Sequence, residues 1–299
     1  MKDRKILVVG GSGFIGGETA IELINRGYEV TIVDVSYPDF DFGDAKFINS
    51  RLEDFSSYAD ELLAANVVYH FASVADIKFS RENPRLTIEQ NVLHLTEFLE
   101  RLRHSKVSRF LYASTQYVHG DLGSFYGASK RCAEIIIRAY AAEFNIDYTL
   151  LRYGSLYGPR AQSWNGLYKY VHEIVTTGKI SYEGSGGETR EYIHVRDAAR
   201  LSVDILEKEY RNRALTLTGQ QLIKSSELLN LIFEIINKPA NIKFDSKHCN
   251  QSHYATTPHR YTLEPAIKIV PEYFTDFSQG IMELITEIRG RVDDEGGNI

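Results

Sequence analysis

A tyrosine and a lysine, Tyr126 and Lys130, lie four residues apart near the start of a segment with helical spacing. Residues four apart share one face of a helix, so the phenol and the ammonium group can come close together. A free tyrosine has a pKa near ~10 and is a poor base at neutral pH, but a neighbouring cation favours phenolate and lowers that pKa. The pair can therefore exchange a proton with a hydroxyl group while the adjacent carbon–hydrogen bond breaks.

Two hydroxyl residues, Ser114 and Thr115, end a predicted strand about a dozen residues before this pair. In doubly wound folds the carboxyl ends of the strands form the edge at which ligands bind. We therefore expect Thr115 to hydrogen-bond the oxygen that exchanges its proton with Tyr126. Alternatively, the Thr115 hydroxyl only forms a local turn at the end of the strand. The alternative for Tyr126 and Lys130 is an exposed aromatic side chain beside a surface cation.

Three glycines, Gly10, Gly13 and Gly16, follow a predicted strand and open a predicted helix. A tight turn requires a residue that tolerates positive φ, and close approach of a pyrophosphate requires that no side chain intervene. The N-terminus of the helix adds unpaired N–H groups and the positive end of its dipole. The spacing predicts a turn that binds dinucleotide phosphates.

An acidic residue, Asp34, ends the second predicted strand eighteen residues after Gly16. A carboxylate at this place accepts hydrogen bonds from both ribose hydroxyls of adenosine and repels a 2′-phosphate, which favours NAD over NADP. The alternative is a glycine turn that only packs helix on strand, with a solvated acid nearby. The succession of strand, turn, helix, strand and acid favours cofactor binding.

The first 155 residues alternate between strand-like and helix-like segments, which predicts an α/β fold with a doubly wound parallel sheet. After Gly158 the segments become shorter and less regular. Strands are predicted at Lys5–Gly10, Glu29–Asp34, Ala45–Ile48, Val67–Ala72, Arg109–Ser114 and Tyr148–Tyr153. Helices are predicted at Phe14–Arg26, Ser56–Ala65, Arg85–His104, Gly127–Phe144, Asn165–Thr177, Arg196–Lys208, Ser225–Asn237 with Ser225 as the N-cap, and Phe277–Ile288.

The composition narrows the range of functions. The chain has 299 residues and a net charge of −6 without a basic stripe, so a nucleic-acid partner is not expected. No apolar run reaches the length of a membrane span, and the N-terminus lacks the features of a signal peptide. The two cysteines, Cys132 and Cys249, suggest no disulfide framework, so we expect a cytoplasmic location. His248, Cys249, His253 and His259 fit no common zinc spacing, and no metal site is predicted.

Taken together, these motifs resemble the extended short-chain dehydrogenase/reductases, in particular the NAD-dependent nucleotide-sugar epimerase/dehydratase family whose members are similar to UDP-glucose 4-epimerase. The resemblance covers residues 1–235 well and the rest loosely. The segments that carry it are Gly10–Gly16, Asp34, His70–Ser73, Asn91, Tyr112–Thr115, Tyr126–Lys130, Leu151–Tyr153, Tyr157–Arg160 and Arg190–Asp197.

The resemblance implies a Rossmann-type NAD-binding domain over residues 1–158, to which 190–210 returns. Residues 159–189 and 211–288 are then a smaller C-terminal α/β lobe that binds the substrate, and the polar segment 289–299 is a disordered tail. A homodimer is expected through the helices at 85–104 and after Tyr126, although that face could also pack within one chain.

The resemblance also implies the roles of individual residues. Arg190 resembles the arginine that grips the substrate diphosphate, and Lys130 also holds the nicotinamide ribose. Cofactor contacts are expected from Gly10, Gly13, Phe14, Ile15, Gly16, Asp34, Leu52, Phe71, Ala72, Ser73, Asn91, Ser114, Tyr126, Lys130 and Tyr153. Substrate contacts are expected from Thr115, Gln116, Tyr126, Ser155, Arg190 and Arg260.

The sequence departs from the family pattern at four places. Ser50-Arg51 replaces Gly-Asp after the third strand, so the usual contact of that Asp with the adenine is not expected. Gln116-Tyr117 replaces the Asp-Glu of dehydratases, which disfavours elimination of water. Gly154-Ser155 replaces Phe-Asn, and 253–261 lacks the usual pattern.

The leading prediction is an NAD-dependent nucleotide-sugar epimerase that acts through a 4-keto intermediate, with a nucleotide-diphosphate sugar as its partner. A nucleotide-sugar 4-dehydrogenase or 4-keto reductase would use the same site. A non-catalytic dinucleotide-sensing protein is a third possibility, because fold alone does not give function.

Overall fold

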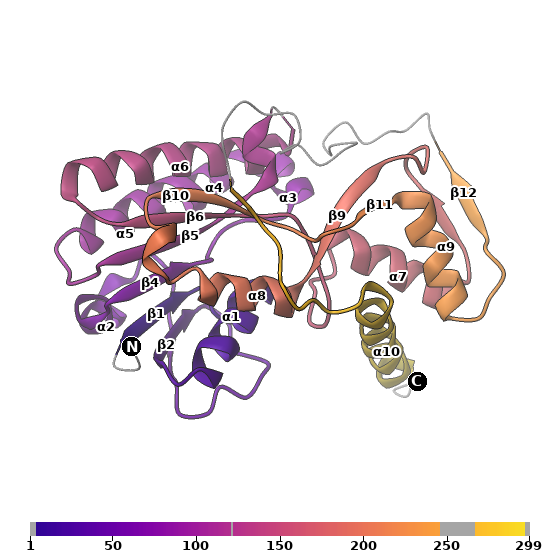
Figure 1. Cartoon of the computed structure of the whole chain (residues 1–299), viewed down its shortest axis with the longest axis horizontal. Helices are drawn as coiled ribbons and strands as arrows, with labels where there is room; N and C mark the ends of the chain where they lie inside the picture. Colours follow the sequence, from indigo (N-terminus) through magenta and orange to yellow (C-terminus); the bar gives the residue numbers. More distant parts are fainter. Residues whose placement is uncertain (1–3, 121, 246–266, 297–299) are drawn as a thin grey trace.

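The computed structural model describes residues 4–120, 122–245 and 267–296, and its largest element is a parallel sheet of eight strands (Figure 1). The strand order is β13-β10-β6-β5-β4-β1-β2-β3. The strands are β1 (Lys5–Val9), β2 (Glu29–Asp34), β3 (Lys46–Asn49), β4 (Val67–His70), β5 (Arg109–Thr115), β6 (Tyr148–Tyr153), β10 (Arg213–Leu217) and β13 (Ile267–Ile269).

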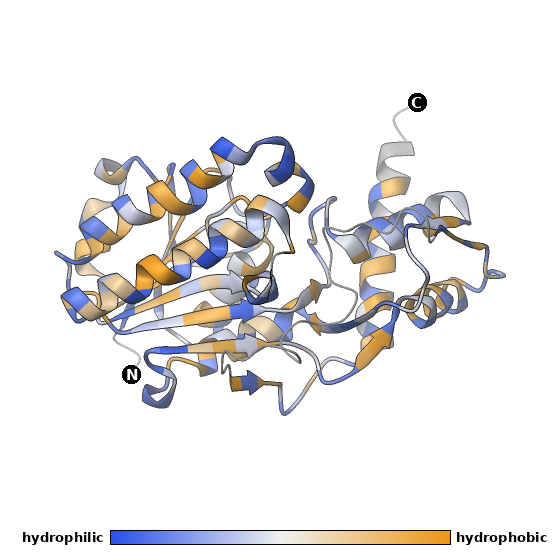
Figure 2. Ribbon diagram, turned by 90° about the horizontal axis from the view of Figure 1, so that it is seen from above, coloured by the Kyte–Doolittle hydropathy of each residue, from blue (hydrophilic) through white to orange (hydrophobic). Residues whose placement is uncertain are grey.

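The sheet is covered by helices on both faces, as the alternating sequence pattern predicts. On one face, α1 (Phe14–Asn25) and α8 (Val195–Asp204) enclose a core of buried aliphatic residues. On the other, α2 (Ala59–Ala64), α5 (His94–Leu102) and α6 (Ser124–Phe144) enclose a second core. The central strands are apolar runs because parallel strands are buried on both sides. The ribbon coloured by hydropathy shows these apolar strands at the centre of the domain (Figure 2). The predicted doubly wound fold is confirmed.

A smaller group of elements lies beyond the carboxyl ends of the sheet strands (Figure 1). It has a three-stranded sheet, a two-stranded sheet and three helices around a separate apolar core. Its elements are β7 (Ser155–Tyr157), α7 (Gly166–Thr177), β8 (Ile180–Tyr182), β9 (Thr189–His194), β11 (Leu222–Lys224), α9 (Ser225–Ile235), β12 (Ile242–Phe244) and α10 (Phe277–Gly296). We call this group the lobe.

The structure differs from the predicted domain limits at several places. Strands β7 and β9 form the three-stranded sheet of the lobe with β11, so 155–157 and 190–194 do not belong to the NAD-binding domain. Strands β10 and β13 pair with the main sheet, so 213–217 and 267–269 do not belong to the lobe that was predicted over 211–288. Helix α10 continues to Gly296, so the prediction of a disordered tail is wrong over 289–296. The helix extends because Arg291 pairs with Glu287 one turn earlier and Val292 packs on the lobe core.

The helices between residues 77 and 102, and the N-cap of α9, also differ from the prediction. Helix α3 (Ile77–Glu82) was missed, although Asp76 caps it by accepting a hydrogen bond from the Lys78 N–H at 2.8 Å. The predicted helix at 85–104 is α4 (Pro84–Ile88), a π-helical turn (Glu89–Leu93) and α5. The N-cap of α9 is Lys224, because the Ser225 hydroxyl is inside the helix and accepts a hydrogen bond from Tyr182.

Within the described ranges, no helix is long and apolar enough to cross a membrane. A cytoplasmic location stays a prediction.

The first turn of α1 depends on two close backbone approaches. Gly10 has φ +79°, and a Cβ there would lie 2.4 Å from the backbone nitrogen of Ala72. A Cβ on Gly16 would lie 2.1 Å from the carbonyl oxygen of Gly10. Both neighbours are backbone atoms, so no side-chain rotation can make room, and the turn requires glycine.

We expect Gly16→Ala to lower the free energy of unfolding by about 1–3 kcal/mol, because the methyl group forces the turn apart. Urea unfolding followed by circular dichroism measures this. Gly290→Ala is the matched control, since Gly290 is also helical but has nothing within 4 Å of an added Cβ. Equal stability of the Gly16 variant and the wild type would contradict the close approach.

Candidate active site

A cavity of about 1300 Å³ lies between the carboxyl ends of the sheet strands and the lobe. Such an edge is the usual ligand site of an open parallel sheet. Residues far apart in sequence and predicted for both cofactor and substrate line this one cavity. They are Gly10, Gly13, Phe14, Ile15, Gly16, Asp34, Leu52, Phe71, Ala72, Ser73, Ser114, Thr115, Tyr126, Lys130, Tyr153, Ser155 and Arg190.

The glycine turn and Asp34 form one end of the cavity. The Asp34 carboxylate accepts a hydrogen bond from the Ser12 N–H at 3.0 Å and another from the Ser36 N–H at 3.1 Å. These contacts hold the carboxylate beside the turn, where an adenosine ribose would lie against a bound pyrophosphate. Gly10, Gly13 and Gly16 line the cavity and place no side chain between the backbone of the turn and a ligand. The residues present therefore fit a dinucleotide.

Leu52 also lines the cavity near this end. Its carbonyl accepts a hydrogen bond from the buried Tyr58 hydroxyl at 2.5 Å. Ser50 and Arg51, which replace the Gly-Asp of the family pattern, line the cavity beside it. The acidic side chain of Glu53 also lines the cavity next to them, and the absence of the usual adenine contact stays a prediction.

Lys130 is buried in the wall of the cavity and held at three points. Its ammonium group donates to the carbonyl of Ala113 at 2.7 Å and to the Ser73 hydroxyl at 3.0 Å, and it lies 4.6 Å from the centre of the Tyr112 ring. Burial lowers the pKa of Lys130 to about 7, although the charge of Glu134 opposes this shift. Its charge is therefore sensitive to what occupies the cavity.

Tyr126 lies one helical turn before Lys130, in the first turn of α6. Gly123 starts this helix with φ +85°, and the Tyr126 N–H donates to the Ser80 hydroxyl of α3 at 3.2 Å. The Tyr126 ring meets the Tyr117 ring edge-on, with centroids 6.2 Å apart. Helix α3 and Tyr117 therefore fix the phenol at the cavity, on the same helix face as Lys130.

Thr115 ends β5, and its position is compatible with both interpretations of this residue, a local turn and a contact with a ligand. Its hydroxyl accepts a hydrogen bond from the Tyr117 N–H at 3.4 Å, which is the local turn, and its side chain also lines the cavity. The hydroxyl hydrogen is still available to a bound ligand, because a hydroxyl can accept and donate together.

The structure places two predicted contact residues behind the cavity wall. Asn91 is buried in the π-helical turn, where its amide accepts from the Val74 N–H at 2.7 Å and donates to the Val74 carbonyl and the Ser129 hydroxyl, each at 2.9 Å. Gln116 is buried and donates to the Arg152 carbonyl at 3.3 Å. Neither lines the cavity. Their amides hold neighbouring segments in place, and their contacts with cofactor and substrate stay predictions.

Two other predicted residues line the cavity with their hydroxyl groups engaged elsewhere. The Ser114 hydroxyl donates to Glu134 at 2.5 Å, and the Tyr153 hydroxyl is 2.7 Å from that of Ser202 in α8. Arg260 and the histidines at 248, 253 and 259 lie outside the described residues. In the described ranges, no group of three or more His, Cys, Asp or Glu side chains is arranged to hold a metal ion.

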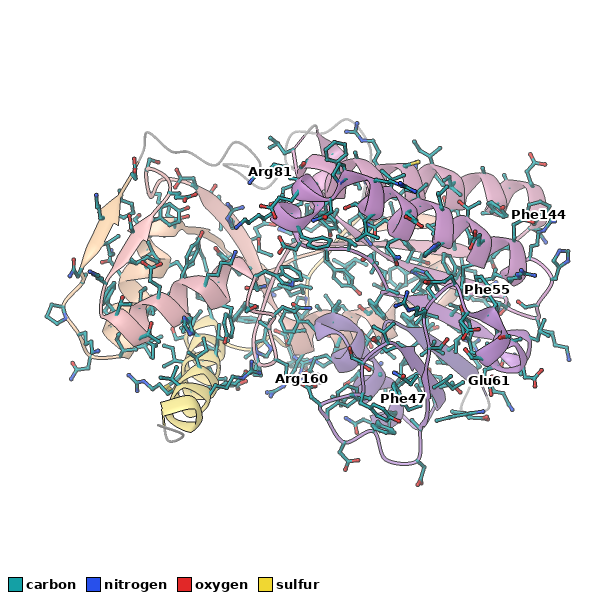
Figure 3. The ribbon with its side chains drawn as sticks, turned by 180° about the vertical axis from the view of Figure 1, so that it is seen from behind. Phe47, Phe55, Glu61, Arg81, Phe144 and Arg160 are labelled. Atoms are coloured by element: carbon teal, nitrogen blue, oxygen red, sulfur yellow. The ribbon has the colours of Figure 1, made fainter. Side chains whose placement is uncertain are left out.

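Three basic residues at the lobe end of the cavity were not predicted as site residues from the sequence. Lys78 and Arg81 come from α3, and Lys169 comes from α7. With Arg190 of β9 they bring four cationic side chains to the lining, against Asp76 and Glu183 in the same region. Figure 3 shows Arg81 at the end of the sheet domain nearest the lobe. A capping Asp76 before Ile77 was the signal that could have predicted α3.

The sequence matches the NAD dependent epimerase/dehydratase family over residues 6–216. The chain belongs to this family. It is therefore an NAD-dependent enzyme of the extended short-chain dehydrogenase/reductase type, and the predictions of family, enzyme and cofactor are confirmed.

Individual relatives differ in activity. The chain is 26% identical over 329 residues to UDP-glucuronic acid decarboxylase 1 of Arabidopsis thaliana, a match that covers 99% of this chain and 72% of that protein. It is 27% identical over 253 residues to a putative UDP-glucose 4-epimerase of Methanocaldococcus jannaschii, covering 76% and 81%. The fold is similar to that of UDP-glucuronic acid 4-epimerase from Bacillus cereus, solved with UDP-glucuronic acid and NAD, with a TM-score of 0.83, 21% identity and coverage of 96% and 99%.

We expect Asp34→Ala to weaken NAD binding about 10- to 100-fold, because each hydrogen bond to a charged acceptor contributes roughly 1.5–3 kcal/mol. Binding of NADP should change less, since the repulsion of its 2′-phosphate is lost as well. Calorimetric titration with both cofactors measures the ratio. Asp41→Ala is the control, because Asp41 also accepts a loop N–H but does not line the cavity. An unchanged preference for NAD would argue against the ribose contact.

Proposed function

We propose that the chain is a nucleotide-sugar 4-epimerase that works through a 4-keto intermediate. The observation that carries this proposal is one cavity lined by Thr115, Tyr126 and Lys130 together with the glycine turn and Asp34. Relatives that are named as 4-epimerases support it. The four cations at the lobe end suit the diphosphate of an activated sugar, because guanidinium and ammonium groups bind phosphate oxygens well.

Proton transfer is assigned to Tyr126. As phenolate it removes the proton from the sugar O4, and the ammonium group of Lys130 stabilises that phenolate. The Thr115 hydroxyl donates a hydrogen bond to the same oxygen. NAD, which the glycine turn and Asp34 would hold, would supply the acceptor for the hydride of C4 and the source of its return.

The inversion of C4 depends on the lobe. While Arg190 and the neighbouring cations hold the diphosphate, the keto sugar turns over and presents its other face. Tyr126 then returns the proton to O4. The keto sugar must stay in the cavity, which has a volume of about 1300 Å³.

Three alternative reactions would use the same site. A 4-dehydrogenase or 4-keto reductase would stop after one hydride transfer. A decarboxylase, the activity named for one relative, would act on a uronic acid, because the 4-keto group makes loss of the C6 carboxylate easy. Gln116 and Tyr117 follow Thr115 here, so the acid and base for elimination of water are missing at these positions. Retention of the tyrosine–lysine pair argues against a non-catalytic sensor.

Incubation with UDP-, GDP-, CDP- and dTDP-sugars distinguishes these reactions. An isomeric product without net change in NADH supports epimerisation. Stoichiometric NADH formation or consumption would replace the proposal by net oxidation or reduction, and release of carbon dioxide would replace it by decarboxylation.

We expect Tyr126→Phe to lower kcat by about 10²- to 10⁴-fold, because the phenol is the group that moves the proton. NAD binding should survive, since the variant lacks only one hydroxyl. Steady-state assays and calorimetry measure the two effects. Tyr140→Phe is the control on the same helix, and Tyr140 does not line the cavity. Full turnover by the Tyr126 variant would remove this mechanism.

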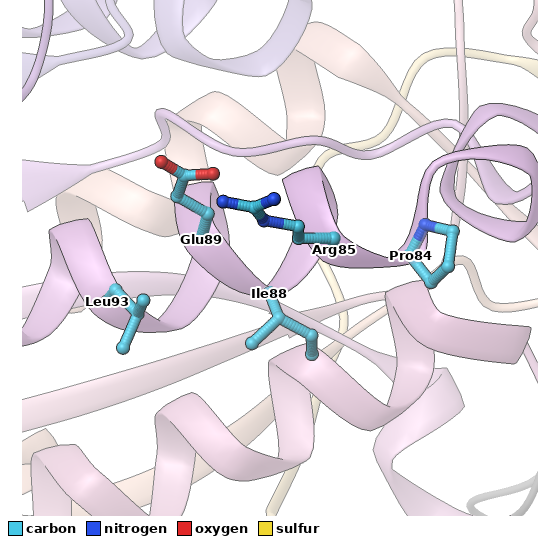
Figure 4. A pocket seen from close by; sticks show the side chains of 5 residues that line it. All are labelled: Pro84, Arg85, Ile88, Glu89 and Leu93. Atoms are coloured by element: carbon cyan, nitrogen blue, oxygen red, sulfur yellow. The ribbon is translucent and has the colours of Figure 1, made fainter.

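We infer that a second copy of the chain covers the outer face of α4, the π-helical turn, α5 and α6. Leu93 is 55% exposed there and Ile135 is 61% exposed. A further pocket of about 440 Å³ on this face is lined by Pro84, Arg85, Ile88, Glu89 and Leu93 (Figure 4). Two such faces can meet about a two-fold axis, with each copy burying the apolar side chains of the other.

If so, Leu93→Arg should convert a dimer into a monomer, because a buried arginine without a partner opposes association. Light scattering after size-exclusion chromatography measures the mass. Leu63→Arg is the control, as Leu63 is 48% exposed on α2, away from this face. A wild-type protein that runs as a monomer would contradict the inferred dimer.

A further inference from the structure

A buried ionic network lies directly behind the tyrosine–lysine pair. Glu134 is one turn beyond Lys130 on α6, so Tyr126, Lys130 and Glu134 follow each other along one helix face. Only 4% of the Glu134 side chain and 1% of the Arg152 side chain are exposed. The two side chains form an ion pair with each other, because an unpaired buried charge is costly.

Arg152 of β6 binds both carboxylate oxygens of Glu134. Its Nε donates to one oxygen at 2.9 Å and its Nη2 to the other at 2.6 Å, which is a two-pronged contact. The Ser114 hydroxyl of β5 donates to the first oxygen at 2.5 Å. Residues 114 and 152 are paired across the sheet, so one carboxylate joins α6 to both strands.

Helix α6 also contacts Ala113, the residue of β5 before Ser114. The Lys130 ammonium group donates to the carbonyl of Ala113, and Glu134 accepts from Ser114, the next residue along. The residue after that is Thr115. Two consecutive contacts between α6 and β5 therefore fix the distance from the Thr115 hydroxyl to the Tyr126 phenol.

The charge of Glu134 acts on Lys130. Burial lowers the pKa of Lys130, and the Glu134 carboxylate is the charge that opposes this effect. The His70 ring and the Tyr112 phenol also lie near Lys130. Burial lowers the pKa of His70 to about 3 and raises that of Tyr112. The titratable and charged groups near Glu134 include Lys130, Tyr112, Arg138 and Arg152, with His119 in contact with Arg152.

We propose that Glu134 is a positioning residue that keeps Lys130 protonated while Tyr126 is phenolate. The pair can lose its first proton from either group. The carboxylate beside Lys130 favours loss from the phenol, which gives the active form. Without the carboxylate, loss from the ammonium group is favoured, and the phenol stays protonated and inactive. This inference rests on the proposed proton transfer by Tyr126 and is independent of the identity of the sugar.

Glu134→Gln tests it through the pH dependence of kcat/KM. Removal of a negative charge makes the site more positive, so the pair releases its first proton at lower pH. We expect the midpoint of the acid limb to fall by about one pH unit and the plateau to fall about 10-fold or more. An unchanged midpoint with a lower plateau would show a purely structural role and overturn the proposal.

Glu134→Asp is the matched control because it keeps the charge and shortens the side chain. Its midpoint should stay at the wild-type value even where its plateau falls. A midpoint shift equal to that of Glu134→Gln would also overturn the proposal. NAD titration and thermal unfolding show whether each variant is folded.

A second variant covers the case in which Glu134→Gln does not fold. The double change Glu134→Gln with Arg152→Gln replaces the ion pair by two amides and leaves no charge without a partner. Its midpoint should also lie below that of the wild type, since Glu134 is the charge that acts on Lys130. A wild-type midpoint would overturn the proposal. If Tyr126→Phe keeps full turnover, the proposed function fails first, so the two failures are distinguishable.

Discussion

The structure depends above all on the burial of one ammonium group, that of Lys130, between helix α6 and the end of strand β5. Its contacts with the Ala113 carbonyl, the Ser73 hydroxyl and the Tyr112 ring join a helix, a strand and a loop at the cavity. Burial alone would neutralise this group. The carboxylate of Glu134 one turn further and a phenolate at Tyr126 are the groups that can keep it charged. The site is thus a small set of charges that must be arranged together.

A second constraint comes from the parallel sheet. Strand β1 lies between β4 and β2 in the sheet, and α1, which follows β1, lies on the face opposite to α5, which follows β4. The space at their carboxyl ends is therefore open to a ligand. The glycine turn, Asp34, Ser73 and Thr115 are all at or just past strand ends, so the topology gathers them at one edge. The lobe then closes the far side with cations from α7 and β9.

Local sequence signals were sufficient for the elements that hold the main chemistry. The strands β2 and β6 were predicted to the residue, and the cavity brings together seventeen predicted site residues. Two predicted site residues do not line the cavity. Asn91 and Gln116 stand beside the active site in sequence, but a π-helical turn and a short helical turn direct their amides into the protein. Strands β10 and β13 were missed because each is short and pairs only with distant segments.

By itself the sequence determined the glycine turn, the acid at the end of β2, the alternation of strands and helices, and the spacing of Tyr126 and Lys130 along one helix face. These features follow from backbone geometry over a few residues. Only the tertiary structure decided that Arg152 and Ser114 meet Glu134, that α3 supports Tyr126, and that four cations converge on the lobe end of the cavity. Such contacts depend on how distant elements pack, and packing is fixed by the complete core rather than by any local segment.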